Sequence, residues 1–112
     1  MSDRGLCVLL VEDDAHLRRV VRAALAAHGY RLIEAGTLAE AEAHATRDAP
    51  DLVLLDLGLP DGDGLDFARH LRRRSTVPII VVSARGRRED QAEALEAGAD
   101  EYLAKPFSVN DL

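Results

Sequence analysis

The most constraining feature of the sequence is a run of four apolar residues, 52–55, that is followed directly by an acid, Asp56. A loop of Gly, Pro and Asp follows over residues 58–64. A continuous Val/Leu run is typical of a parallel strand that helices cover on both faces, and Asp56 then lies at the carboxyl end of that strand. In open α/β sheets ligands bind at this edge, so polar residues that follow other strands would meet Asp56 there.

The rest of the chain alternates between short apolar segments and helical patterns. The predicted strands cover residues 6–11, 31–35, 52–55, 78–82 and 100–103, and the predicted helices cover 15–28, 38–49, 65–74 and 89–97. Thr37 with Glu40 is typical of a capping box, and Gly29 and Pro50 are typical helix stops. This alternation predicts an α/β fold with a doubly wound, five-stranded parallel sheet. Its order, 2-1-3-4-5, places the first and third strands side by side.

The first predicted helix is amphipathic. Its apolar stripe consists of Leu17, Val20, Val21, Ala24 and Leu25, while three arginines, at positions 18, 19 and 22, lie off that stripe. This spacing predicts that the stripe faces the sheet.

Composition narrows the classes of function. The 112 residues include 20 acids and 14 bases, and the net charge of −6 disfavours a nucleic-acid-binding module. The one cysteine, Cys7, lies in an apolar run and is expected to be a core thiol, because a disulfide framework or a zinc cluster needs several. No apolar run reaches membrane-spanning length, and residues 1–6 lack a signal-peptide pattern. We therefore expect a soluble, cytoplasmic domain without a membrane partner.

Three other predicted strands bring polar residues to the edge that holds Asp56. Glu12 and Asp13 follow the first strand, Ser83 ends the fourth, and Lys105 follows the fifth. Two carboxylates about 4 Å apart repel by roughly 4 kcal/mol at an effective dielectric constant near 20, so the acids need a cation or a proton. Mg²⁺ suits them, because it binds one or two carboxylates, keeps several waters and bridges to a phosphate.

This arrangement predicts the transfer of a phosphoryl group to a carboxylate. A carboxylate can act as a nucleophile and form an aspartyl phosphate, and the protein then mainly positions the groups and stabilises charge on the transferring oxygens. Asp56 would be the nucleophile, and Asp13 with Asp56 would hold the metal. Ser83 and Lys105 would each contact one phosphoryl oxygen.

The same residues resemble the signature of two-component response-regulator receiver domains. The matching motifs are Val11-Glu12-Asp13-Asp14, Asp56, Pro60-Asp61-Gly62-Asp63-Gly64, Ser83-Ala84 and Lys105-Pro106-Phe107. They occur in the right order from about residue 6 to the end of the chain. The resemblance implies a flavodoxin-like fold, and residues 55–64 are closest to the subfamily with winged-helix DNA-binding outputs, the OmpR/PhoB-like regulators.

The resemblance also implies a role for each site residue. Asp56 would be the phosphoacceptor, and Glu12 and Asp13 the acidic pair, with Asp13 as the direct metal ligand. The other implied roles are the backbone carbonyl of Gly58 as a metal ligand, Ser83 as the switch hydroxyl, Tyr102 as the switch aromatic, Lys105 as the phosphate-pairing lysine, and a cis peptide before Pro106.

The partners implied by the resemblance are a sensor histidine kinase and, on activation, a second copy of the chain. DNA would be contacted only through an output domain that residues 1–112 do not contain. Receiver domains end in a fifth helix, and only its opening residues, 108–112, are present, so we expect this helix to be truncated. We expect the uncovered apolar surface either to destabilise the chain or to be buried against another copy.

Two other functions stay open. An aspartyl phosphatase often carries its general acid two residues after the nucleophile, and position 58 is Gly, which argues against this class. A pseudo-receiver would bind partners without phosphorylation and would have no need of the acids, Ser83 and Lys105. The expected function is therefore a phosphorylation-activated switch that controls transcription and catalyses only its own phosphotransfer and dephosphorylation.

The remaining charged residues are expected to have ordinary structural roles. Asp61 and Asp63 are interpreted as turn residues, and an EF-hand is excluded because its twelfth position would be Arg72 rather than Glu. The three arginines at 72–74 are interpreted as solvated cations that complement the dipole at a helix C-terminus. The four histidines, at positions 16, 28, 44 and 70, are interpreted as surface residues without a metal.

Overall fold

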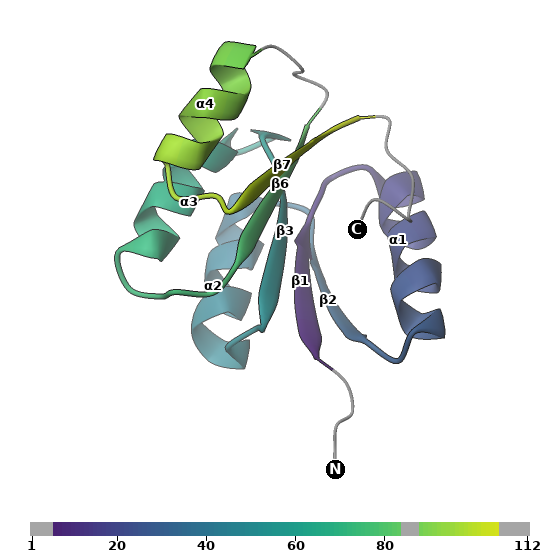
Figure 1. Cartoon of the computed structure of the whole chain (residues 1–112). Coiled ribbons are helices and arrows are strands. Elements are labelled where there is room, and N and C mark those ends of the chain that lie inside the picture. The colour runs from purple at the N-terminus through teal and green to yellow at the C-terminus, as the bar shows by residue number, and fades with distance from the viewer. Residues whose placement is uncertain (1–5, 84–87, 106–112) are drawn as a thin grey trace.

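A single parallel sheet forms the centre of the computed structural model, which describes residues 6–83 and 88–105. Its strands are β1 (Cys7–Val11), β2 (Arg31–Ala35), β3 (Leu52–Asp56), β6 (Ile79–Ser83) and β7 (Glu101–Ala104), in the order β2-β1-β3-β6-β7 (Figure 1). All four pairings between neighbouring strands are parallel. The predicted fold and strand order are therefore confirmed.

Helices cover both faces of this sheet. They are α1 (Ala15–Ala27), α2 (Leu38–Asp48), α3 (Gly64–Arg72) and α4 (Arg88–Glu96). Helix α1 covers one face and the other three helices cover the opposite face (Figure 1). In β1, Val8 and Leu10 pack with residues of α1, whereas Leu9 and Val11 belong to the larger core with residues of the other three helices. Because successive side chains of a strand point to opposite faces, the run of apolar residues fills both cores.

The observed elements end close to the predicted positions, and the differences have local causes. Helix α2 stops at Asp48 because Ala49 adopts the left-handed conformation, with φ 45°. Helix α1 stops at Ala27, and Gly29 follows with φ 84°, as a left-handed stop requires. The expected loop at 58–64 contains a short antiparallel pair, β4 (Gly58–Leu59) and β5 (Gly62–Asp63).

The predicted apolar stripe of α1 is only partly correct. Val21 and Leu25 are buried and Leu17 is half-buried, but Val20 is 41% exposed. Successive helical residues lie about 100° apart, so a helix that packs against the sheet through Val21 turns Val20 away from it. The residues expected to open a fifth helix, and the peptide bond before Pro106, lie outside the described residues.

The interpretation of the arginines at 72–74 as solvated cations is wrong for Arg72. Its guanidinium donates hydrogen bonds to the carbonyls of Ser75, Val77 and Gly98, at 2.8–3.1 Å, and to the Asp100 carboxylate at 3.2 Å. The same carboxylate accepts a 2.8 Å hydrogen bond from the backbone N–H of Ile79. Arg72 therefore joins α3 to the segments before β6 and β7, and only the neighbouring arginines are exposed.

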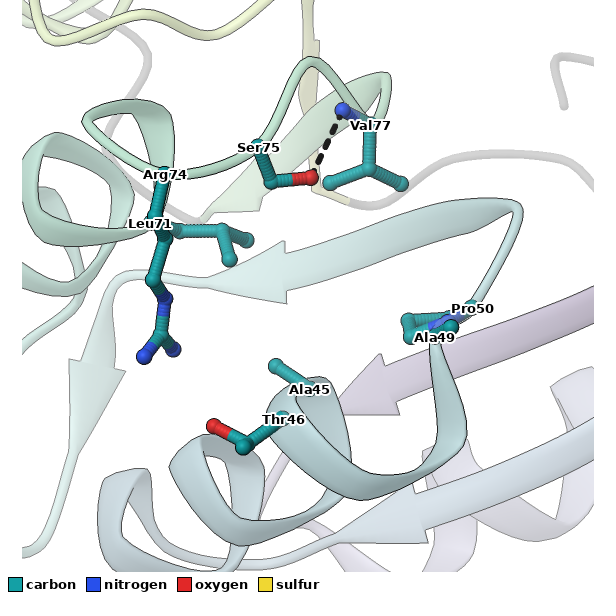
Figure 2. A pocket seen from close by; sticks show the side chains of 8 residues that line it. All are labelled: Ala45, Thr46, Ala49, Pro50, Leu71, Arg74, Ser75 and Val77. Carbon is teal, nitrogen blue, oxygen red and sulfur yellow. Dashed lines mark hydrogen bonds between the residues drawn. The ribbon is translucent and has the colours of Figure 1, made fainter.

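A pocket of about 310 Å³ opens between the C-terminal ends of α2 and α3 (Figure 2). Ala45, Ala49, Pro50, Leu71 and Val77 give it an apolar lining, and Thr46, Arg74 and Ser75 add polar atoms. Pro50 and Val77 precede β3 and β6, so the pocket lies at the amino ends of the strands, at the opposite edge from Asp56. Among the described residues no helix is long and apolar enough to cross a membrane.

Candidate functional site: an acidic cluster with one lysine

The candidate site lies where four neighbouring strands end. Glu12 and Asp13 directly follow β1, Asp56 is the last residue of β3, Ser83 is the last residue of β6, and Lys105 directly follows β7. Parallel register holds these ends at one edge, since Val11 pairs with Leu55 and Ser83 pairs with Ala104. The backbone N–H of Lys105 also donates a 2.7 Å hydrogen bond to the Ser83 carbonyl. The convergence predicted from the sequence is therefore present.

The three acids form one compact group. One carboxylate oxygen from each of Glu12, Asp13 and Asp56 lies within 4.8 Å of the other two. Glu12 and Asp56 are only 3% and 7% exposed, whereas Asp13 faces solvent. Two carboxylates are therefore withdrawn from water at the bottom of the cluster, and the third is accessible from outside.

Lys105 supplies the counter-charge to the two buried acids. Its Nζ lies 3.0 Å from Glu12 Oε1 and 3.3 Å from Asp56 Oδ1. Glu12 Oε2 accepts a further hydrogen bond, of 3.1 Å, from the backbone N–H of Asp14. One ammonium thus bridges two carboxylates. Because the cluster contains a third acid, negative charge remains in excess.

Burial and charge shift the pKa values of these groups in a consistent way. Burial raises the pKa of Asp56, and the nearby charge of Asp13 raises it further, although Lys105 opposes both effects. Burial likewise raises the pKa of Glu12, although the hydrogen bonds from Lys105 and Asp14 act to lower it. Burial works against the Lys105 ammonium, but the two acids outweigh it and raise the pKa of Lys105. Both acids therefore gain from an additional cation.

The donor set fits a hard divalent cation. It consists of carboxylate oxygens, which Mg²⁺ prefers, and the described residues bring no cysteine or histidine into the same group. Asp13 is the acid that a hydrated ion reaches first, because it is the exposed member of the cluster. Gly58 lies two residues after Asp56, in β4, and its implied role as a carbonyl ligand stays a prediction.

Gly64 lets α3 begin against the backbone at the end of β3. A Cβ atom at this position would lie 2.8 Å from the Asp56 carbonyl oxygen and 3.0 Å from Leu57 Cα. The backbone N–H of Gly64 donates a 3.1 Å hydrogen bond to the Leu57 carbonyl. Only glycine fits this approach without displacing the strand end that carries Asp56.

Asp61 and Asp63 were expected to be turn residues, and the structure gives both a role as helix caps. Asp63 accepts a 2.9 Å hydrogen bond from the backbone N–H of Leu65 at the start of α3. Asp61 reaches a different helix, where its carboxylate accepts from Leu38 and Ala39 at the start of α2. The cap on α2 joins segments more than 20 residues apart, so no local sequence signal identifies it.

The two expected switch residues lie on the neighbouring strands β6 and β7. Ser83 is 2% exposed. It follows Val82, which pairs with Asp56 across β3 and β6. Tyr102 is half-buried against the larger core, and among the described residues its hydroxyl is buried without a hydrogen-bond partner. A buried hydroxyl without a partner is unusual, so the aromatic ring rather than the hydroxyl holds Tyr102 in this position.

The histidines lie outside the cluster. Three of them are exposed, at positions 16, 28 and 70, and His44 is half-buried beside Asp48, with Nδ1 2.9 Å from Oδ2. None belongs to the group of potential metal ligands found in the described part of the chain.

Comparisons with known proteins agree with this geometry. The family model for the response regulator receiver domain matches residues 8–112. The chain is 52% identical over 105 residues to the KDP operon transcriptional regulatory protein KdpE of Escherichia coli, and 41% identical over 108 residues to the phosphate regulon regulator PhoB of the same organism. Each match covers 94% of this chain, and 47% of the relative. The chain therefore spans about half the length of these curated relatives.

Solved structures give the same result. The non-phosphorylated HemR receiver domain of Leptospira biflexa superposes with a TM-score of 0.88 at 36% identity, covering 95% of this chain and 86% of that one. The RstA receiver domain of Klebsiella pneumoniae gives 0.87 at 31% identity, covering 91% and 87%. The sequence of residues 55–64 predicted a similarity to the regulator of the Kdp potassium system and to the winged-helix regulators, and both similarities are confirmed. The chain belongs to the receiver-domain family of two-component response regulators.

Proposed function

We propose that Asp56 accepts a phosphoryl group from the phosphohistidine of a sensor kinase, with Mg²⁺ held by Asp13, Asp56 and the Gly58 carbonyl. The observation that carries the proposal is the cluster itself, in which three carboxylates lie within 4.8 Å and Lys105 bridges two of them. The chain would catalyse only its own phosphotransfer and dephosphorylation, as a switch rather than as an enzyme with turnover on another substrate.

In the proposed step, an Asp56 carboxylate oxygen attacks the phosphorus in line with the leaving imidazole nitrogen. The P–O bond forms as the P–N bond breaks, and the bonding electrons leave with the imidazole, which takes up a proton. Bound Mg²⁺ supplies positive charge to the phosphoryl oxygens. Lys105 already lies 3.3 Å from Asp56 Oδ1, so its ammonium is placed to pair with one of those oxygens.

The proposed response to phosphorylation starts at Ser83. Its hydroxyl would donate to another phosphoryl oxygen, and Tyr102 would follow the movement within the core. A local change of charge would thus alter the surface of α4 and β7. Activated chains would pair with a second copy through this surface.

The wider context is also part of the proposal. Residues 1–112 would be the receiver domain of a regulator that binds DNA through a separate output domain. The support is that KdpE and PhoB, which are transcriptional regulators, are about twice as long as the part that this chain matches. A cytoplasmic location follows from that role and stays an expectation.

Acetyl phosphate tests the chemistry directly. We expect the intact mass of the chain to increase by one phosphoryl group, only with Mg²⁺, and the adduct to be labile to hydroxylamine. Asp56→Asn should abolish the adduct and keep the far-UV circular dichroism spectrum, because the amide is nearly isosteric but a poor nucleophile. An adduct that persists in this variant would refute the assignment of Asp56. A folded wild-type chain that gains no adduct would favour a pseudo-receiver.

Lys105→Ala tests the switch separately from the chemistry. We expect the variant still to form the adduct but to lose the phosphorylation-dependent change, because no ammonium pairs with the phosphoryl oxygens. Hydrogen exchange in β7 and the fraction of dimer, each measured with and without acetyl phosphate, report that change. A wild-type response in this variant would contradict the proposed role of Lys105.

A further inference from the structure

An arginine of α1, Arg18, contacts the backbone of the loop that carries two acids of the cluster. The loop between β1 and α1 has only three residues, 12–14, and it carries both members of the acidic pair. From the second turn of α1, Arg18 Nη1 donates a 2.8 Å hydrogen bond back to the Glu12 carbonyl oxygen. The backbone N–H of Glu12 donates to the Ala35 carbonyl of β2 at 2.9 Å. Both backbone polar groups of Glu12 are therefore held from outside the loop.

Holding the Glu12 carbonyl also places Asp13. The peptide group between the two residues is planar, so a fixed carbonyl fixes the N–H and the Cα of Asp13 as well. The Asp13 side chain itself is exposed and makes no hydrogen bond or ion pair within residues 6–83 and 88–105. The position of its carboxylate therefore depends on the backbone, in which Arg18 holds the Glu12 carbonyl.

Arg18 is in turn held by a carboxylate of the edge strand. Its Nε lies 3.3 Å from Glu34 Oε1 in β2. Arg22 donates to the same carboxylate through two hydrogen bonds, of 2.6 and 2.8 Å. The hydrogen bond from Arg22 and the charges of both arginines lower the pKa of Glu34 despite its burial, so the carboxylate stays ionised. Glu34, itself held by Arg22, thus fixes the direction of the Arg18 guanidinium.

The space for the guanidinium is provided by Gly36. A Cβ atom at this position would lie 3.3 Å from Arg18 Nη1, closer than most Cβ contacts. The planar guanidinium can contact the Glu34 carboxylate and the Glu12 carbonyl at the same time, whereas a lysine ammonium is a single point donor on a flexible stem.

We propose that Arg18 is a positioning residue for metal binding, because it fixes the Glu12–Asp13 peptide and thereby places the Asp13 carboxylate where it can share a cation with Asp56. This inference rests on the proposed function, since it concerns the Mg²⁺ site of the same cluster. The competing explanation is purely structural: Arg18 would tie α1 to β2 and affect only the stability of the fold. Mg²⁺ affinity distinguishes the two explanations.

The test is a calorimetric titration of Mg²⁺ into the 112-residue chain without any phosphodonor. We expect Arg18→Ala to weaken Mg²⁺ binding about tenfold, the size typical for the loss of an outer partner of a metal ligand. Arg18→Lys should recover part of the affinity, because one N–H can still reach the carbonyl. Arg19→Ala is the matched control, because it removes the same charge from an exposed residue of the same helix. Its affinity for Mg²⁺ should not fall below that of the wild type.

The direction of the effect separates positioning from charge. Removing a cation near an acidic cluster would by Coulomb's law strengthen the binding of Mg²⁺, so weaker binding cannot come from the lost charge. In the acetyl phosphate reaction, the half-saturating Mg²⁺ concentration of Arg18→Ala should rise by the same factor as its dissociation constant. The rate at saturating Mg²⁺ should stay within about twofold of the wild type, since Arg18 acts through the metal ligand.

Wild-type Mg²⁺ affinity in Arg18→Ala would overturn the inference, even if the variant melts at a lower temperature. If Arg18→Ala does not fold, Arg18→Met replaces it, since the long apolar side chain keeps much of the packing but donates no hydrogen bond to the Glu12 carbonyl. Weaker Mg²⁺ binding by Arg18→Met supports the inference, because this variant also removes a cation, and unchanged binding overturns it. A wild-type chain that binds no Mg²⁺ refutes the proposed function itself, and this inference with it.

Discussion

The close approach of α3 to the end of β3 gives the sharpest prediction, the effect of Gly64→Ala. The new Cβ would lie 2.8 Å from the Asp56 carbonyl oxygen, 3.0 Å from Leu57 Cα and 3.2 Å from Leu57 Cδ2. Two of these atoms belong to the backbone, so no change of rotamer relieves the contact. Overpacking of this kind costs about 1–3 kcal/mol. The strand end that carries Asp56 has to move, and phosphorylation should slow as well.

Gly58→Ala provides the matched control for stability. It makes the same substitution six residues earlier, in β4, but its Cβ would meet no atom within 4 Å. For a chain of this length, each kcal/mol corresponds to roughly 4 °C in melting temperature. We therefore expect Gly64→Ala to melt about 4–12 °C below Gly58→Ala in a thermal scan followed by circular dichroism. Equal melting temperatures for the two variants would refute the argument from close approach.

Two further predictions concern charge. Because burial raises the pKa of Asp56 and of Glu12 above their ordinary values of 3.8 and 4.5, folding favours their protonated forms. In metal-free buffer the free energy of unfolding, measured in urea titrations, should therefore increase as the pH falls from neutral towards those raised pKa values. Saturating Mg²⁺ should remove this increase. A free energy of unfolding that decreases steadily from pH 7 would contradict the prediction. Arg72→Ala should lose about 2 kcal/mol in the same titrations, because the partly buried carbonyls of Val77 and Gly98 lose a charged donor, whereas the exposed Arg73→Ala should lose almost nothing. Equal losses in the two variants would show that the Arg72 contacts do not contribute.

The pH prediction has a lower limit set by other acids. Hydrogen bonds with Arg22 lower the pKa of Glu34, and backbone N–H groups of α2 lower the pKa of Asp61. Groups with a lowered pKa lose their contribution to stability once the pH falls below the ordinary carboxylate values. Stability should therefore pass through a maximum above those values. Asp56→Asn, which removes one of the two buried acids, should show a smaller increase.

The strand order and the acidic cluster could be predicted because they depend on short-range patterns. A strand buried on both faces reads as a continuous apolar run, and each site residue directly ends or follows such a run. Parallel strands then bring these ends to one edge whatever the details of packing. For this reason Glu12, Asp56 and Lys105 could be expected to lie close together, as they do, although 93 positions separate the first from the last.

The contacts that were missed depend on distant backbone groups. Arg72 was interpreted as solvated because nothing in residues 72–74 indicates that the Gly98 carbonyl lies 2.8 Å from its guanidinium. Asp61 was interpreted as a turn residue because its partners are the first N–H groups of another helix. Val20 was expected to face the sheet because periodicity defines a stripe but not the part of it that packs.

The sequence by itself determined the family, the parallel sheet and the residues that meet at its carboxyl edge, because these follow from residue type and order. Only the tertiary structure decided how those residues differ from one another. It buries Glu12 and Asp56, exposes Asp13, and sets one ammonium between the two buried acids. Burial and Coulomb interactions depend on distances in space rather than along the chain, so the pKa shifts and the support from Arg18 could be read only from the folded protein.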